Sequence, residues 1–399
     1  MIDYQIILAI IFVISLLIFL IAKRKELSVQ KIVFPLIFII LYRTKLGLKL
    51  MDSIAEKYRE LVRLFGYFSI GIGFLGMFFI SFSVLVVILK LILQPATSSS
   101  DFVLVLPFTN IPGIGFLPFT HWIIAIFVLA IIHEFAHGVV ARAHNVPVKS
   151  SGFAILSVLL PIVPAAFVEP DEKDMEKRSD FIQYSILAAG PVSNLIFAFF
   201  IFLIISLVMN PIQAAITEPI GFTFDITNES MPASQAGLTG DELITFYNGD
   251  KVATAKTFIE DMYYCSDPGE KITFGNENKT YIVTAISHPE QENRGYIGIN
   301  NINNEIKVVN VPNWVASVFF WLRDLFKWLL LLNFFIGLAN LLPLGIVDGG
   351  RMLHTALHTT MKNKSHAQRI WKIIAVLFLF FLVFGLLVNY FGNPFLIFG

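Results

Sequence analysis

The feature that most constrains this chain is a short polar motif inside an otherwise apolar helix. The sequence HEFAH occupies residues 133–137, within the nearly uninterrupted apolar stretch of residues 121–141. That stretch is long enough to predict a membrane-spanning helix. Ionisable side chains cost roughly 2.5–3.5 kcal/mol each at the centre of such a helix, so they are rare there unless they have a function. The motif therefore indicates a chemical site at membrane depth.

The spacing of the motif predicts which side chains act together. Residues four apart in a helix lie on one face, so His133 and His137 would project side by side. Two neutral imidazoles can hold a zinc ion. Glu134 could take a proton from a water molecule while the zinc polarises the bond under attack. We therefore predict His133 and His137 as zinc ligands and Glu134 as the general base. The alternative is that these side chains only hydrogen-bond to neighbouring helices.

A third ligand is expected, because catalytic zinc usually has three protein ligands and a water molecule. Asp348 follows the apolar run of residues 314–342, and two glycines come directly after it. If the spans alternate in direction, Asp348 lies at about the depth of His137. We predict Asp348 as the third ligand, and the alternative is a helix-terminal cap in ordinary water.

Other histidines could compete for this role. His354 and His358 are also four apart, but no acidic residue lies between them and basic residues surround them. We expect both at the water boundary, together with His144 and His366.

The composition of the chain places it among membrane proteins. Of its 399 residues, 56% are hydrophobic and only 15% are charged, and the mean hydropathy is +0.73. The formal net charge is zero, which gives no reason to expect a nucleic-acid partner. Cys265 is the single cysteine, which excludes an internal disulfide and a cysteine-based metal site.

The apolar runs predict a polytopic α-helical membrane protein with about six spans of roughly 20 residues each. The runs are residues 4–22, 66–93, 121–141, 181–209, 314–342 and 373–398. Basic residues at 23–25 follow the first run, which favours an uncleaved anchor with its N-terminus outside. Alternation of the spans then places the active site toward the cytoplasmic side.

The segments between the spans have different characters. Residues 32–41 are apolar but short, and we expect a re-entrant or interfacial segment there. Residues 42–64 carry apolar residues at helical spacing among basic residues, which favours an amphipathic helix on the bilayer surface over a soluble linker helix. Residues 95–120 read as an external loop. Residues 152–167 contain prolines among β-branched residues and predict a re-entrant β-hairpin.

Residues 211–310 are polar, with turn signals between short apolar runs, and they predict a small β-rich soluble domain outside the membrane. The chain then has four regions. These are an N-terminal membrane region (1–120, with the amphipathic helix 42–64), the first half of a catalytic membrane core (121–210), the soluble domain (211–310), and the second half of the core with a C-terminal span (311–399).

One further motif lies inside the span at 181–209. Gly190 and Pro191 are followed by Asn194. A Gly-Pro pair is expected to open the helix locally and free backbone groups. Asn194 would either satisfy those groups or bind an extended peptide.

With these residues assembled, the chain resembles the site-2 protease family of intramembrane zinc metalloproteases. The resemblance rests on residues 133–137, on the Gly-Pro-x-x-Asn element at 190–194, on residues 164–169, and on the stretch 340–349, whose aspartate is the family's third zinc ligand. It implies an enzyme that cleaves single-span membrane proteins within their transmembrane segments, in regulated intramembrane proteolysis. It also implies that Asn194 and Asn340 bind the unwound substrate.

The soluble segment resembles a PDZ domain, on residues 231–244, 247–249 and 294–299. Such domains bind an extended C-terminal peptide along a sheet edge, and residues 295–299 would then lie near the carboxylate-binding loop. The alternative is a plug that excludes substrates by size. For the whole chain, the alternatives to a protease are a non-catalytic membrane scaffold of the same fold and a transporter. The transporter is disfavoured because the sequence has no internal repeat.

Overall fold

The computed structural model describes residues 4–33, 37–94, 102–111, 113–158, 160–240, 242–264, 267–288 and 291–395. The chain divides into two compact units. The first combines Met1–Ile205 with Arg323–Gly399, and the second is Ser206–Leu322. The predicted soluble segment, residues 211–310, lies inside the second unit.

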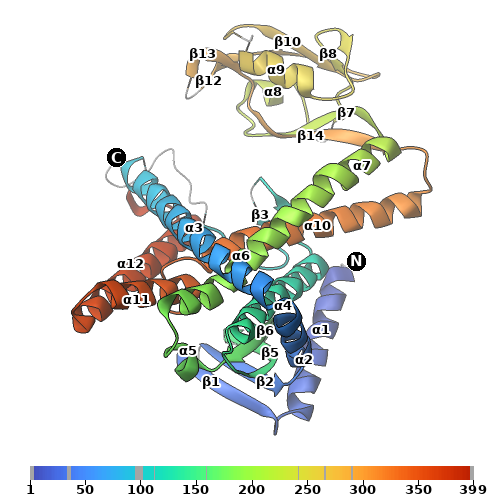
Figure 1. Cartoon of the computed structure of the whole chain (residues 1–399). Coiled ribbons are helices and arrows are strands. Elements are labelled where there is room, and N and C mark those ends of the chain that lie inside the picture. Colours follow the sequence, from blue (N-terminus) through green and yellow to red (C-terminus); the bar gives the residue numbers. More distant parts are fainter. Residues whose placement is uncertain are drawn as a thin grey trace. The chain divides into compact units, whose positions relative to one another are not determined.

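Helices make up most of the first unit (Figure 1). They are α1 (Tyr4–Ala22), α2 (Leu48–Lys57), α3 (Arg59–Leu93), α4 (Phe119–Ala143), α5 (Glu172–Met175), α6 (Asp180–Ile204), α11 (Asp348–Thr360) and α12 (Lys364–Phe391). Helix α10 (Asn313–Ala339) begins in the second unit and ends in the first.

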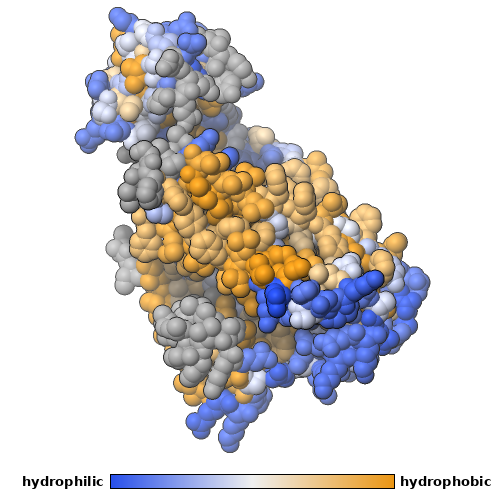
Figure 2. All heavy atoms as spheres, turned by 90° about the vertical axis from the view of Figure 1, so that its left-hand side faces the viewer, coloured by the Kyte–Doolittle hydropathy of each residue, from blue (hydrophilic) through white to orange (hydrophobic). Residues whose placement is uncertain are grey.

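Five helices in the described part of the chain are long and apolar enough to cross a membrane: α1, α3, α4, α12 and the continuous helical run Asp180–Ile216. That run comprises α6, the π-helical turn Ile205–Met209 and α7 (Asn210–Ile216). Figure 2 shows hydrophobic residues gathered in a broad band over the helical unit. These helices confirm the prediction of a polytopic helical membrane protein.

The sixth predicted span, residues 314–342, is not among these five helices. It forms the 27-residue helix α10, which carries Arg323, Asp324 and Lys327 near its middle. Asp324 lies 2.6 Å from Lys327 and 3.7 Å from His121 Nε2. The described residues thus contain five such helices, where about six spans were predicted, because charges in the middle of α10 interrupt its apolar sequence. That α10 crosses the membrane stays a prediction.

Helix α4, which carries the HEFAH motif, has its N-terminus fixed by α1. Gln5 Oε1 accepts a hydrogen bond from the Thr120 backbone N–H at 3.0 Å, and Gln5 Nε2 donates to Thr120 Oγ1 at 3.2 Å. The first N–H groups of a helix have no partner within the helix, so this buried side chain supplies one. Before α4, the described residues of the predicted external loop contain two short paired strands, β3 (Asn110–Ile111) and β4 (Gly115–Phe116).

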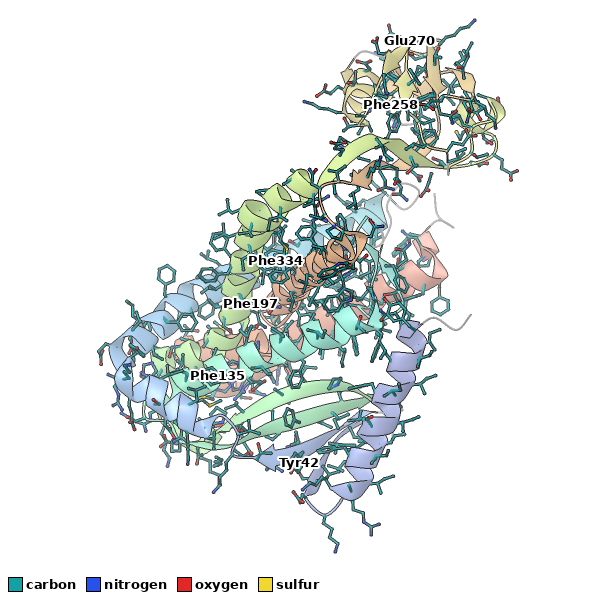
Figure 3. The ribbon with its side chains drawn as sticks, turned by 90° about the vertical axis from the view of Figure 1, so that its right-hand side faces the viewer. Tyr42, Phe135, Phe197, Phe258, Glu270 and Phe334 are labelled. Carbon is teal, nitrogen blue, oxygen red and sulfur yellow. The ribbon has the colours of Figure 1, made fainter. Side chains whose placement is uncertain are left out.

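A four-stranded antiparallel sheet lies beside α4 (Figure 3). Its order is β1-β2-β5-β6, with β1 (Leu27–Val33), β2 (Ile37–Thr44), β5 (Val148–Val158) and β6 (Leu160–Pro170). The segment predicted as re-entrant or interfacial, 32–41, therefore belongs to two strands, apart from residues 34–36, which lie outside the described residues. Ile40 pairs with Ile155 and Leu41 with Ala154, and all four are buried. This pairing joins distant parts of the chain, so the local sequence did not reveal it.

The amphipathic helix predicted at 42–64 is divided among three elements. Residues 42–44 end β2, α2 follows after a turn, and α3 begins at Arg59. Met51 and Ala55 of α2 are buried in a cluster with valines of α4, whereas Leu46 and Leu50 are exposed. Exposed leucines near basic residues suit a lipid surface, and contact with a bilayer stays a prediction.

The predicted hairpin 152–167 is present as β5 and β6, and it is longer at both ends. Its position within a bilayer stays a prediction. At its open end, Ser150 and Arg43 hydrogen-bond Glu169 at 2.7 and 3.2 Å. These contacts, chiefly the Ser150 hydroxyl, hold the pKa of Glu169 below its usual range. They connect β2, β5 and β6.

The second unit is rich in β-structure. Its strands are β7 (Thr217–Ile226), β8 (Phe246–Tyr247), β9 (Asp250–Lys251), β10 (Lys271–Gly275), β11 (Thr280–Thr284), β12 (Ile286–His288), β13 (Gln291–Tyr296) and β14 (Ile299–Val308). They form a β11-β10-β8-β9 sheet and the pairs β12-β13 and β14-β7, with helices α8 (Pro232–Gln235) and α9 (Lys256–Tyr264). The core is an aromatic cluster of Phe222, Phe224, Phe258 and Phe274.

Candidate metal centre

Helix α4 brings the two motif histidines together on one face. His133 Nε2 lies 3.1 Å from His137 Nε2, and each side chain is only 10% exposed. The rings meet edge-on with their centroids 4.7 Å apart. This arrangement follows directly from their spacing of one helical turn.

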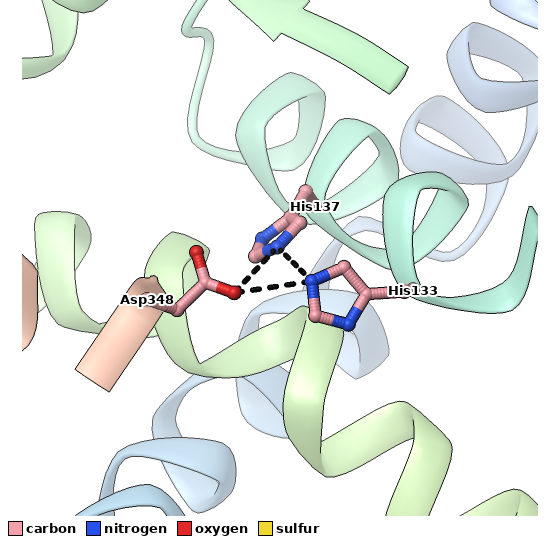
Figure 4. Close-up of side chains that lie close together, drawn as sticks. All are labelled: His133, His137 and Asp348. Carbon is pink, nitrogen blue, oxygen red and sulfur yellow. Dashed lines mark hydrogen bonds and ion pairs between the residues drawn. The ribbon is translucent and has the colours of Figure 1, made fainter. Parts of the chain in front are cut away.

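Asp348 completes the group from a distant part of the chain (Figure 4). Its Oδ2 atom lies 3.0 Å from His133 Nε2 and 3.4 Å from His137 Nε2, and its side chain is 13% exposed. Each of the three residues offers a ligand atom, and these atoms all lie within 4.8 Å of one another. The structure therefore brings together the three residues that the sequence predicted as zinc ligands.

Two glycines allow Asp348 to reach α4. Asp348 is the first residue of α11, and a Cβ on Gly349 would lie 2.1 Å from the Leu341 carbonyl oxygen. A Cβ on Gly350 would lie 1.7 Å from the Leu344 carbonyl oxygen. Only glycine permits so close an approach of two backbone segments. The first turn of α11 can therefore fold back against residues 341–345, which presents the Asp348 carboxylate to the histidines.

The second ring nitrogen of each histidine faces helix α6. His137 Nδ1 lies 2.6 Å from the Ile186 carbonyl oxygen, and His133 Nδ1 lies 3.2 Å from Asn194 Nδ2. Metal-binding histidines usually have such a partner, which fixes the orientation of the ring. The contacts at Nδ1 thus fix the orientation of both rings, and their Nε2 atoms point toward Asp348.

Gly190 of α6 faces the Nε2 atoms and fits the interpretation of a metal centre. A Cβ at this position would lie 2.3 Å from His137 Nε2 and 2.8 Å from His133 Nε2. Any larger residue would therefore occupy the space onto which the ligand atoms converge. Two imidazole nitrogens and a carboxylate oxygen are also a donor set typical of catalytic zinc. The residues present consequently fit a zinc ion.

Glu134 lies beside the group and is bound to the sheet. Its Oε2 atom accepts a hydrogen bond from the Val168 backbone N–H of β6 at 2.8 Å. Strand β6 is an edge of the sheet and pairs only with β5 among the described residues, and the Val168 N–H donates to Glu134 on the side away from β5. This bond holds the carboxylate next to the two histidines.

The predicted substrate-binding residues lie in two different environments. Asn194 is fully buried, with 0% of its surface exposed, and its amide contacts His133. Asn340 is half-buried, and its backbone carbonyl accepts a hydrogen bond from the Gly349 N–H at 2.8 Å. Pro191 lies within α6 without ending the helix.

The backbone contacts of the site could not be found from sequence. The Ile186 carbonyl and the Val168 N–H act through the main chain, which every residue possesses, so no residue type marks them. Gly190 did have a signal, because it belongs to the Gly-Pro-x-x-Asn element, but its contact with the histidines depends on how α6 packs against α4.

The competing histidines lie elsewhere. His354 and His358 are half-buried on α11, and their Nε2 atoms lie 2.8 and 3.1 Å from Gln368 Oε1. His366 is exposed, as expected. His144, predicted at the water boundary, is instead buried at the end of α4 with 4% exposure, because its ring packs near that of Tyr67. Burial and the neighbouring Arg63 and Arg178 lower its pKa.

Comparisons with known proteins show which proteins this chain resembles. Residues 121–384 match the family model described as Peptidase family M50. An uncharacterised protein of Methanocaldococcus jannaschii is 29% identical over 347 residues, which are 85% of this chain and 83% of that protein. The zinc metalloprotease RasP of Geobacillus kaustophilus is 22% identical over 227 residues, which are 46% of this chain and 52% of that protein. The matched family region includes the HEFAH motif of α4 and all of α11, which together supply the metal group.

Proposed function

This chain belongs to peptidase family M50, the site-2 protease family, and we propose that it hydrolyses peptide bonds within the transmembrane segments of single-span membrane proteins. The observation that carries the proposal is the group of His133, His137 and Asp348, whose ligand atoms lie within 4.8 Å of one another, with Glu134 on the same helix. The HEFAH motif lies in a helix that is apolar enough to span a membrane, which supports a substrate bond at membrane depth.

The chemistry follows from the residues of the site. A zinc ion held by His133, His137 and Asp348 would supply a Lewis acid for the scissile carbonyl and the attacking water. Glu134 takes a proton from that water and passes it to the leaving amine. The Val168 N–H restrains Oε2 of this carboxylate, and Oε1 is left to receive the proton. The buried surroundings strengthen each of these electrostatic interactions.

A peptide bond in a helix is protected by hydrogen bonds, so the substrate must unwind before it is cut. We propose that the unwound segment pairs with the free edge of β6. Because successive backbone groups alternate in direction along a strand, Ala166 presents its N–H on the same side as Val168. The N position of Pro164 also faces this outward side. Proline has no N–H there, so the pairing of β6 with β5 loses no hydrogen bond. Asn340 is proposed as a further contact for the unwound segment.

This pairing predicts an effect of Ala166→Pro, which removes the outward N–H and leaves the bonds to β5 intact. Loss of one hydrogen bond should lower kcat/KM by roughly 2–10-fold, without any change in bound zinc. Ala166→Val keeps the N–H and serves as the control. Equal kcat/KM for Ala166→Pro and Ala166→Val would show that the substrate does not pair at this position.

The side of the membrane on which each unit lies is proposed from the alternation of spans, counting α10 as one of them. We propose that the active site faces the cytoplasmic side, and that the second unit lies outside and binds C-terminal peptides in the manner of a PDZ domain. The β-rich fold of this unit is compatible with that role. Fluorescence anisotropy with a labelled peptide tests it, and an amidated copy of the same peptide should bind more weakly because it lacks the terminal charge.

The deciding experiment compares the wild-type protein with Glu134→Gln, both purified in detergent. Zinc content is measured by atomic absorption, and cleavage is measured on a single-span test substrate. We expect equal zinc in both proteins and cleavage only by the wild type. If both proteins bind zinc but neither cleaves any of a panel of single-span substrates, the result would favour a non-catalytic scaffold that binds partners through its second unit. The absence of zinc from both would refute the metal centre.

A further inference from the structure

The two histidines of the metal group differ in what holds their second ring nitrogen. His137 Nδ1 faces the Ile186 carbonyl oxygen at 2.6 Å. A carbonyl can only accept a hydrogen bond, so His137 must carry its proton on Nδ1. His133 Nδ1 instead faces the side-chain amide of Asn194 at 3.2 Å. An amide has both an acceptor and a donor, so it can partner either form of the His133 ring.

The atoms that face the centre converge on one another. His133 Nε2 lies 3.1 Å from His137 Nε2 and 3.0 Å from Asp348 Oδ2. These three atoms are the ones that would ligate a shared ion. The other nitrogen of the His133 ring, Nδ1, faces the Asn194 amide.

Ligation of a metal through Nε2 requires one particular tautomer of His133. The Nε2 lone pair must be free, so the proton must be on Nδ1, and this N–H then needs an acceptor. Asn194 Oδ1 can provide it, because rotation of the amide by a half turn exchanges Oδ1 and Nδ2, which are nearly equal in size. In the observed orientation Oδ1 is buried and has no hydrogen-bond partner in the described part of the chain.

We propose that Asn194 is a positioning residue for His133, and that its side-chain oxygen accepts a hydrogen bond from Nδ1–H of this ring and thereby sets the affinity of the centre for zinc. The inference rests on the proposed metal centre. It also assigns Asn194 a role other than substrate contact. The Asn194 side chain is fully buried, and it lies on the side of the His133 ring away from Asp348. Helix α10 covers it at Gly337, since a Cβ added to Gly337 would lie 3.2 Å from Asn194 Cβ.

A second buried asparagine provides a matched control. Asn333 of α10 is also 0% exposed, and its Nδ2 donates to the Leu329 carbonyl of its own helix at 2.8 Å. Its Oδ1, like that of Asn194, has no hydrogen-bond partner among the described residues. Asn333 contacts none of the proposed ligands, so Asn333→Leu reproduces the cost of removing a buried amide without touching His133.

The test measures zinc affinity by competition with a chelator, and the visible absorption of bound Co²⁺, for four proteins in detergent. In Asn194→Leu, zinc should bind about 10–100-fold more weakly, as is usual when a hydrogen-bond partner of a ligand is lost, and the Co²⁺ spectrum should change. Asn194→Asp offers an acceptor to the Nδ1–H and should stay within about tenfold of the wild type. Asn333→Leu should match the wild type.

The outcomes separate this inference from the proposed function. If the wild type binds zinc and Asn194→Leu binds it equally well, Asn194 does not position His133 although the metal centre stands. If Asn194→Leu fails to fold, Asn194→Asp decides: zinc binding as weak as in a His133→Leu ligand deletion would overturn the positioning role, and binding within about tenfold of the wild type supports it. A wild type that binds no zinc overturns both the inference and the metal centre.

Discussion

Asp348 Oδ2 lies 3.0 Å from His133 Nε2, although the two residues are 215 positions apart in the chain. The contact joins α11 to α4, and it closes a group that neither helix could form alone. His137 contributes the third ligand atom from one turn further along α4. The second unit, Ser206–Leu322, is inserted between the two helices in sequence, so the site depends on the fold of the whole first unit.

The contact predicts that the charge of Asp348 is required for metal binding. Asp348→Asn keeps the shape of the side chain and removes its negative charge, so zinc affinity should fall by at least about 100-fold. Chelator competition measures this, with Asp171→Asn as the control, because Asp171 caps α5 and pairs with Lys149. If Asp348→Asn binds zinc as tightly as Asp171→Asn, Asp348 is not a ligand and acts as a helix cap.

Gly190 should tolerate no side chain. The Cβ of Gly190→Ala would lie 2.3 Å from His137 Nε2, so the ring must move and we expect zinc to be lost. Gly71→Ala is the matched control, since its Cβ would meet nothing within 4 Å in α3. That change should stabilise the helix by about 0.5–1 kcal/mol. Zinc content and thermal unfolding are measured for both, and normal zinc in Gly190→Ala would contradict the packing of α6 described above.

The bond from Val168 to Glu134 should affect catalysis without affecting metal binding. Val168→Pro removes the N–H that holds Glu134 Oε2, and this N–H makes no bond within the sheet. A misplaced general base lowers turnover, and a loss of about 10–100-fold in kcat is expected. Zinc affinity should stay at the wild-type value. Val168→Ala, which keeps the N–H, is the control, and a Val168→Pro protein with wild-type kcat would remove Val168 from the mechanism.

The second histidine pair should be irrelevant to zinc. His354 and His358 both contact Gln368 Oε1, so replacing both with leucine should lower the free energy of unfolding by about 1 kcal/mol. The zinc content should equal that of the wild type. His133→Leu is the reference, because it removes a proposed ligand. A double variant with less zinc than the wild type would indicate a metal site on α11.

Several features could be predicted because they depend on local sequence. A stretch of about 20 apolar residues is long enough to span a bilayer, so α1, α3, α4, α6 and α12 were all anticipated. The one-turn spacing of His133 and His137 follows from helix geometry in any fold. The position of Asp348 was predicted by assuming that spans alternate and from the family resemblance of residues 340–349, and the apolar run before it, α10, carries charges near its middle.

The remaining features depend on contacts between distant segments. Residues 37–44 became a strand because they pair with β5, more than 100 positions away, and an apolar run of that length carries no information about its partner. The hydrogen bond between Asn194 and His133, and the space left by Gly190, arise from the packing of α6 against α4. The sequence by itself therefore determined which residues could bind a metal. Tertiary packing decided how those residues are oriented, because backbone groups and a missing side chain fix the orientation.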